Sequence, residues 1–190
     1  MRIKQWLLIG LAVFLLIAVT VLAVVLIKVG TADGDTTKDS KDLREIVGKD
    51  IALSECITYC SDYSEEKLSD EFSKVYSDAV AVTVMSIDEE ADSATIIVNA
   101  PPLKEILEDC LPDDTSGDFE TLFDSYMKNV YKSISDYPSD DFTTTIVTCG
   151  IVDDEGLKFV INNDLTDAIF PNIQQLLAEL LMETLVAEEE

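Results

Sequence analysis

A long apolar segment close to the start of the chain constrains its fold most strongly. Residues 6–27 read WLLIGLAVFLLIAVTVLAVVLI and carry no charge, with Gly10 and Thr20 as the only breaks. As an α-helix rising about 1.5 Å per residue, the segment reaches roughly 33 Å, enough for the hydrocarbon core of a bilayer. A helix also satisfies its own backbone hydrogen bonds in lipid. The segment therefore predicts a single transmembrane helix over residues 6–27.

Removal of this segment as a signal peptide is the main alternative. A signal peptide has an apolar region of about 7–15 residues followed by small residues before the cut. Gly30-Thr31-Ala32 could serve as a cleavage site, but the apolar run is longer than that and ends at Lys28. A lipoprotein is excluded because the first cysteine, Cys56, lies far along the chain. We therefore expect a retained signal-anchor.

Basic residues around the segment suggest its orientation. Arg2 and Lys4 crowd the short leading end, whereas only Lys28 lies close on the other side. Because basic residues favour the cytoplasmic side, residues 1–5 are predicted to be a cytoplasmic stub. Residues 28–41 are small, polar and without period, which is typical of a linker. Residues 42–190 then form an extracytoplasmic domain of a single-pass protein in the cell membrane.

The charge of this domain is strongly negative. From residue 31 onward the chain has 10 basic and 38 acidic residues, a net charge of −28. Such a surface repels nucleic acid and anionic lipid headgroups. Nucleic acid is therefore not expected as a partner, whereas cations, a basic protein surface and plain solubility remain as explanations of the charge.

Histidine is absent from the entire chain. The commonest general base is therefore missing, together with Ser-His-Asp and Cys-His catalytic arrangements and any imidazole metal site. Chemistry on this chain would depend on carboxylates, thiols, hydroxyls or lysines. No catalytic, metal-binding or cofactor-binding residues are predicted.

The four cysteines, Cys56, Cys60, Cys110 and Cys149, are possible disulfide residues. Cys56 and Cys60 stand four apart in an expected helix, so their Cβ atoms should lie about 5–6 Å apart, more than the ~3.5–4.5 Å of a disulfide. Bridges would therefore join these two to Cys110 and Cys149. Buried free thiols are the alternative. The spacing does not favour a four-thiolate zinc site.

Hydrophobic periodicity predicts an α+β domain with an antiparallel sheet packed by helices. An interrupted helical stripe starts after Ser40, with Gly48 bending or splitting it, and a second helix starts after Ser64. Two pairs of strands are expected, over 80–84 with 94–98 and over 142–152 with 157–161. Further helices are expected after Pro101-Pro102, over about 118–135, and from Asp164, with the last helix opening at Pro171.

Two stretches resemble a known superfamily. VNAPPLKEIL (98–107) and GLKFVINNDLTDAI (156–169) look like uncharacterised membrane-anchored or lipid-linked domains of Gram-positive bacteria in the ketosteroid-isomerase and nuclear-transport-factor-like (cystatin-like) α+β superfamily. The resemblance would cover about residues 42–170 and implies a cone with a helix-lined pocket over a curved sheet. The chain departs from it by ending in a long apolar helix where further strands are expected. The superfamily's catalytic residues match no position here, so no activity is implied.

Three functions are consistent with these patterns. The first is a membrane-anchored, non-catalytic extracytoplasmic binding or assembly module with a strongly acidic surface, which meets a cationic protein. The second is an immunity or inhibitor protein against a basic toxin. The third is a small pocket enzyme that uses carboxylates, which would need a cavity containing a buried Asp or Glu.

Overall fold

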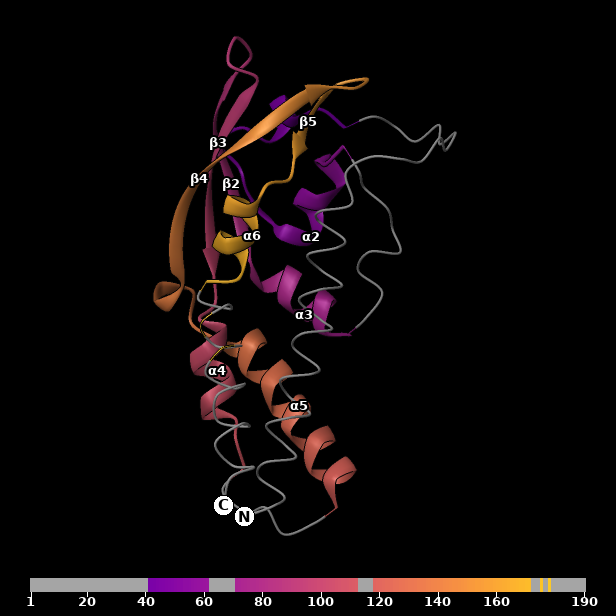
Figure 1. Ribbon diagram of the computed structural model, residues 1–190, viewed down its shortest axis with the longest axis vertical. Helices are drawn as coiled ribbons and strands as arrows, with labels where there is room; N and C mark the ends of the chain where they lie inside the picture. The colour runs from indigo at the N-terminus through magenta and orange to yellow at the C-terminus, as the bar shows by residue number, and fades with distance from the viewer. Residues whose placement is uncertain (1–40, 62–70, 113–117, 172–174, 176–177, 179–190) are drawn as a thin grey trace.

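A curled antiparallel sheet forms the upper part of the molecule in the computed structural model (Figure 1). The structure describes residues 41–61, 71–112 and 118–171, together with residues 175 and 178. Its strand order is β1-β2-β3-β4-β5. The strands are β1 (Asp50–Ala52), β2 (Ala81–Asp88), β3 (Ser93–Ala100), β4 (Thr143–Asp153) and β5 (Leu157–Val160).

Short and long helices cover one side of this sheet and extend below it (Figure 1). The 3₁₀ helices are η1 (Leu43–Ile46), η2 (Ile57–Tyr59) and η4 (Ser139–Asp141). The α-helices are α2 (Leu53–Cys56), α3 (Glu71–Ala79), α4 (Leu103–Asp109), α5 (Phe119–Asp136) and α6 (Asn163–Ile169). This arrangement confirms the predicted α+β class and the antiparallel sheet.

Both predicted strand pairs are confirmed. In β3 the side chains alternate between buried and half-buried positions, as expected for a strand with one face in the core. The turn between β2 and β3 places Asp92 at φ 48°, a left-handed conformation that Asp tolerates better than most residues. The second pair is β4 with β5, and β4 is the longest strand of the sheet.

The interrupted helix predicted for the first part of the domain is confirmed only in part, because Gly48 does split it but a strand stands in its middle. Residues 50–52 form a strand that pairs with β2, and the flanking helical turns η1, α2 and η2 are short. Gly48 lies between η1 and β1 at φ 74°, a conformation that glycine adopts without strain. Apolar residues recur at helical spacing through these turns and through the strand, so the sequence pattern predicted a helix across all of them. Asp42, rather than Ser40, caps η1 by accepting from the Arg44 N–H.

The later helices agree better with the sequence. Helix α4 follows Pro101-Pro102, and α5 covers almost the whole range predicted for it. Asp118 caps α5, and its hydrogen bonds from Thr121 lower its pKa. The cap of α6 is Asn162 rather than the expected Asp164, because the Asn162 carboxamide accepts from the Leu165 N–H at 2.9 Å.

The inner face of the sheet, which faces α2, α3 and α6, is the core of the domain. Its centre is Tyr76 of α3, which is fully buried and stacks between Phe72 and Phe170 with ring centroids 5.7 and 5.1 Å away. The Tyr76 hydroxyl donates to the Ile169 carbonyl at 2.8 Å, so one contact ties α3 to α6. Burial raises the pKa of Tyr76.

Several expectations lie outside the described residues. They are the transmembrane helix over 6–27, the linker up to residue 40, the start of the helix expected after Ser64, and most of the helix expected after Pro171. Within the ranges that the structure does describe, no helix combines the length and apolarity needed to span a bilayer.

Candidate interaction surface

One side of the sheet faces away from the core helices, and its middle carries no further described element. We call it the outer face and define it by the residues whose side chains alternate with the buried ones. Strand pairing aligns four of them across the sheet, because Asp50 pairs with Thr83, Thr83 with Ile97, and Ile97 with Ile146. No described helix covers the middle of this face, and Figure 1 shows α2, α3 and α6 on the opposite side of the sheet.

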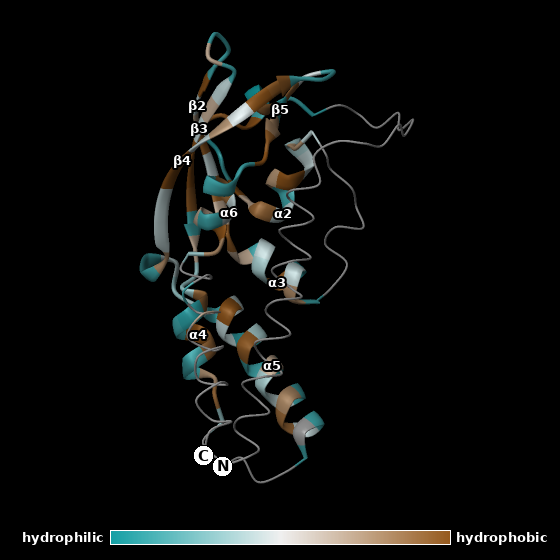
Figure 2. Cartoon of the chain, viewed as in Figure 1, coloured by the Kyte–Doolittle hydropathy of each residue, from teal (hydrophilic) through white to brown (hydrophobic). Residues whose placement is uncertain are grey.

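The middle of the outer face, formed by β2, β3 and β4, has no charged side chain, whereas Asp50 of β1 and Lys158 of β5 flank it on the two sides. Its described residues are Ala81, Thr83, Ser86, Thr95, Ile97, Asn99, Thr144, Ile146 and Thr148. Figure 2 shows the lower half of β4 pale, whereas strongly hydrophilic residues gather at turns and helix ends. An uncharged patch of this size is unexpected on a domain with so many carboxylates.

Three large apolar side chains are exposed on this face or at its bulge, and the least exposed of them is Val152, at 39%. Ile146 is 67% exposed, and Met85, at the bulge where the pairing of β2 with β3 shifts, is 53% exposed. Single exposed apolar residues are common on protein surfaces. Here they lie on or beside the part of the face formed by β2, β3 and β4, which carries threonines and no charged side chain in its middle, the composition expected for the centre of an interface.

Hydrogen bonds between strands hold polar side chains of the outer face in place. The Thr144 hydroxyl donates to Asn99 Oδ1 at 2.7 Å, and the Thr83 hydroxyl donates to Asp50 Oδ1 at 3.0 Å. These cross-strand pairs limit the rotamers of the side chains involved. A partner would therefore meet a preorganised surface.

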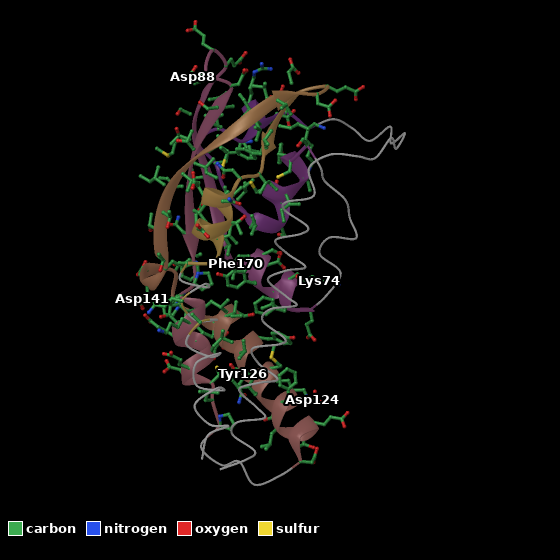
Figure 3. All side chains as sticks on the ribbon, in the orientation of Figure 1. Lys74, Asp88, Asp124, Tyr126, Asp141 and Phe170 are labelled. Atoms are coloured by element: carbon green, nitrogen blue, oxygen red, sulfur yellow. The ribbon has the colours of Figure 1, made fainter. Side chains whose placement is uncertain are left out.

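Acidic residues mark both ends of the sheet. Figure 3 shows Asp88 at the tip of the β2–β3 hairpin and Asp141 at the opposite end, beside the start of β4. At the hairpin end, Arg44 donates to Asp42 and Glu89 at 3.0 Å each. The hydrogen bond from Arg44 to Glu89 raises the pKa of Arg44. The outer face is thus uncharged in its middle and acidic at its ends.

A catalytic pocket built on carboxylates finds no support in the described ranges. None of their Asp or Glu residues is buried, and the buried polar side chains there are those of Ser73 and Ser77. Each buried side-chain nitrogen or oxygen in these ranges has a hydrogen-bond partner. In the same ranges no three His, Cys, Asp or Glu residues gather as they would around a metal ion.

The four cysteines are free thiols in the structure. Cys56, Cys60 and Cys149 are buried, and Cys60 and Cys149 lie near enough to Cys56 to affect it electrostatically. Burial is the main cause that raises the pKa of Cys56, and burial also raises the pKa of Cys149 to about 12. Cys110 lies elsewhere, on the α4–α5 side, where its thiol donates to the Ser133 hydroxyl at 3.3 Å. A disulfide stays a prediction.

The sequence around Ile146 carries a signal for the outer face that is independent of hydrophobic periodicity. Threonines stand at 143, 144, 145 and 148 around Ile146, so the outward positions of this strand lack the charges found elsewhere in the domain. An exposed strand position in so acidic a chain would be expected to carry Asp, Glu or Lys.

Comparisons of this chain with protein-family models, with curated proteins and with solved structures found no match. The resemblance to the ketosteroid-isomerase and nuclear-transport-factor-like superfamily therefore stays a prediction.

Proposed function

We propose that this chain is a membrane-anchored, non-catalytic binding or assembly module. In this proposal residues 6–27 hold it in the cell membrane as a single-pass protein, and its acidic domain meets a cationic protein outside the cytoplasm. The observation that carries the proposal is the outer face, where Met85 and Ile146 are exposed within an uncharged patch between two acidic ends. Interfaces commonly combine an apolar, uncharged centre with a polar rim.

The acidic ends indicate the chemistry of the partner. Carboxylates at the rim favour a surface rich in lysine and arginine and disfavour acidic ones. Rim charges act mainly on the association rate and on the salt dependence of binding. The partner is therefore a protein with a basic rim around an apolar centre.

A charge-neutralisation experiment on the full chain in lipid nanodiscs tests this proposal. The test variant combines Glu90→Gln, Asp154→Asn, Asp140→Asn and Asp141→Asn, which changes exposed carboxylates at both ends of the outer face. The matched control combines Glu71→Gln, Asp78→Asn, Glu120→Gln and Asp124→Asn, which removes the same charge from α3 and α5. Figure 3 shows Asp124 on α5, well away from the sheet.

The partner retained from the native membrane should bind the control variant as it binds the unmodified chain, and the test variant much less. Retention should also fall steeply with salt, because the screening length shrinks from about 30 Å at 0.01 M to about 3 Å at 1 M. Retention that is indifferent both to salt and to the test variant would exclude a cationic partner.

A reporter that is active only in the cytoplasm tests the location. Fused after Glu190, it should be inactive, because the proposal places the domain on the other side of the membrane. An active reporter would reverse the orientation.

A further inference from the structure

Within the described part of the chain, the β4 strand has a free edge along its first half. On one side it pairs with β3 over residues 143–150, and on the other it pairs with β5 over residues 150–153 only. Along residues 143–149 no described strand pairs with the second side.

Two hydrogen bonds show which backbone groups lie on this free edge. The Ile151 N–H donates to the Asp92 carbonyl at 2.9 Å, toward β3, whereas the Thr148 carbonyl accepts from Asn162 Nδ2 at 3.0 Å on the other side. In an antiparallel strand the N–H and C=O groups of alternate residues point the same way. The backbone groups of Thr144 and Ile146 therefore point outward, as those of Thr148 do.

On the opposite side of the sheet β1 is the edge strand, and it leaves little of the first half of β2 unpaired. Strand β1 pairs with the first part of β2, and past its end the Gly48 N–H donates to the Val84 carbonyl at 2.8 Å. Free edges of natural sheets usually carry charges, prolines or bulges that prevent pairing with other chains. The segment TTTIVT at residues 143–148 has none of these. Among the described residues, this stretch of β4 is therefore unpaired on one side and lacks the usual protection.

Carboxylates surround this open edge. Asp140 and Asp141 are exposed just before β4, and Asp164 and Asp167 are exposed on α6, which packs against β4. Asp164 is close enough to β4 to contribute to the raised pKa of Cys149. No Lys or Arg occurs between Lys132 and Lys158. An approaching chain would meet unpaired backbone groups in a negative field.

We propose that the free edge of β4 binds an extended segment of the cationic partner, which adds to the sheet as a strand beside residues 143–147. Main-chain hydrogen bonds to Thr144 and Ile146 provide the affinity, as in other cases of strand addition. Lysine or arginine residues of the added strand pair with the surrounding carboxylates. A second copy of this chain fits less well, because it would bring Asp140 and Asp141 toward the same acidic surroundings. The proposal rests on the proposed function.

Amide hydrogen exchange of the full chain in detergent micelles tests the free edge without any partner. The amides of Thr145 and Val147, which point toward β3, should exchange slowly, and those of Thr144 and Ile146 should exchange fast. Slow exchange at Thr144 and Ile146 in a monomer would show that another part of this chain covers the edge. Slow exchange in a species with the mass of a dimer would show that a second copy covers it. Either result would overturn the proposal.

A synthetic peptide of alternating threonine and valine, with lysines at both ends, serves as the probe. Its binding should slow exchange at Thr144 and Ile146 and leave Thr145 and Val147 as they were. N-methylation of the peptide residues whose N–H groups face β4 should weaken binding at least about tenfold (~1.4 kcal/mol). N-methylation at the alternate residues should have little effect. Equal losses from both patterns would exclude strand addition.

Two variants at one position test the same contact from the protein side. Thr144→Pro removes one outward N–H and should weaken peptide binding about tenfold, since proline is tolerated where a strand N–H faces solvent. Thr144→Val keeps that N–H and should bind like the unmodified chain. If both variants bound the peptide equally well, strand addition would be excluded. It would also be excluded if the native partner bound in a salt-dependent way without slowing amide exchange at Thr144 and Ile146. Either result would leave the proposed function standing. If the native partner bound without salt dependence while the peptide still slowed amide exchange at Thr144 and Ile146, the proposed function would be excluded and the free edge of β4 would stand.

Discussion

The two faces of the sheet are built from the same strands but differ in nearly every physical respect. On the inner face Val82, Ile96, Val98 and Cys149 are at most 1% exposed and pack under helices. On the outer face Ile146, in the same strand as Cys149, is 67% exposed. Burial of apolar area is the main source of stability, so the inner face should determine folding and the outer face should be free to determine recognition. The predictions below test this division.

Replacing Tyr76 should have the largest effect. Tyr76→Ala removes the ring stacked between Phe72 and Phe170 and should lower the free energy of unfolding by about 3–5 kcal/mol. Tyr76→Phe keeps the ring but leaves the Ile169 carbonyl without its donor, at a cost of about 1–3 kcal/mol. Urea unfolding followed by circular dichroism measures both. If the free energy of unfolding fell no more in Tyr76→Ala than in Tyr76→Phe, the aromatic stack would not be the centre of the core.

The inner face should also make stability depend on alkaline pH. Cys149 has a pKa of about 12 when folded, against an ordinary value of 9.0, so the unfolded chain releases its proton first. The contribution of Cys149 to the free energy of unfolding is complete below pH 9. It is lost as the pH rises from 9 toward 12, with a slope of about 1.4 kcal/mol per pH unit.

Unfolding measurements at several pH values under reducing conditions isolate this contribution by difference. Cys149→Ala should flatten the decline relative to the unmodified chain, and Cys110→Ala, at a half-buried position, serves as the control. Identical slopes for the unmodified chain and Cys149→Ala would show that this thiol is not kept from water.

Neighbouring residues of β3 provide a matched comparison between the faces. Val98→Thr places a hydroxyl at a fully buried position and should cost about 1–3 kcal/mol. Ile97→Thr, on the half-buried outer face, should cost less, because its hydroxyl can bind water. Thermal or urea unfolding compares the two. Equal losses would mean that the outer face is covered in the folded chain.

The smallest effect on stability is expected at Ile146. Because this side chain is largely exposed, Ile146→Thr should change the free energy of unfolding by no more than about 0.5 kcal/mol. Partner retention by the same variant should nevertheless decrease, since an apolar side chain is lost from the centre of the proposed interface. A stable variant with unchanged retention would place the interface elsewhere.

The sequence predicted the elements whose patterns are local. Alternating valines and isoleucines identified β2 and β3, and Pro101-Pro102 marked the start of α4. Strand β1 escaped detection because three residues are too few to show a period, and its strand state depends on pairing with β2, which is distant in the sequence. The caps at Asp42 and Asn162 were missed for a related reason, since each competed with a neighbouring polar residue.

The candidate site was less predictable than the fold. Whether a threonine-rich strand is open or covered depends on where the helices pack, which periodicity does not specify. The free edge of β4 depends on the length of β5, which ends after pairing with only the last four residues of β4. The acidic charge was evident from composition, but the structure was needed to show that carboxylates stand at both ends of the outer face while its middle has none.

The buried thiols of Cys56, Cys60 and Cys149 have a consequence for the way the chain matures. In an oxidising compartment these sulfur atoms can react only before the core closes, so folding and oxidation compete in time. A chain that folds first keeps its sulfurs reduced without needing an enzyme to protect them. A chain that folds late leaves these thiols exposed to oxidation for longer, before its first helical turns and its fourth strand pack together.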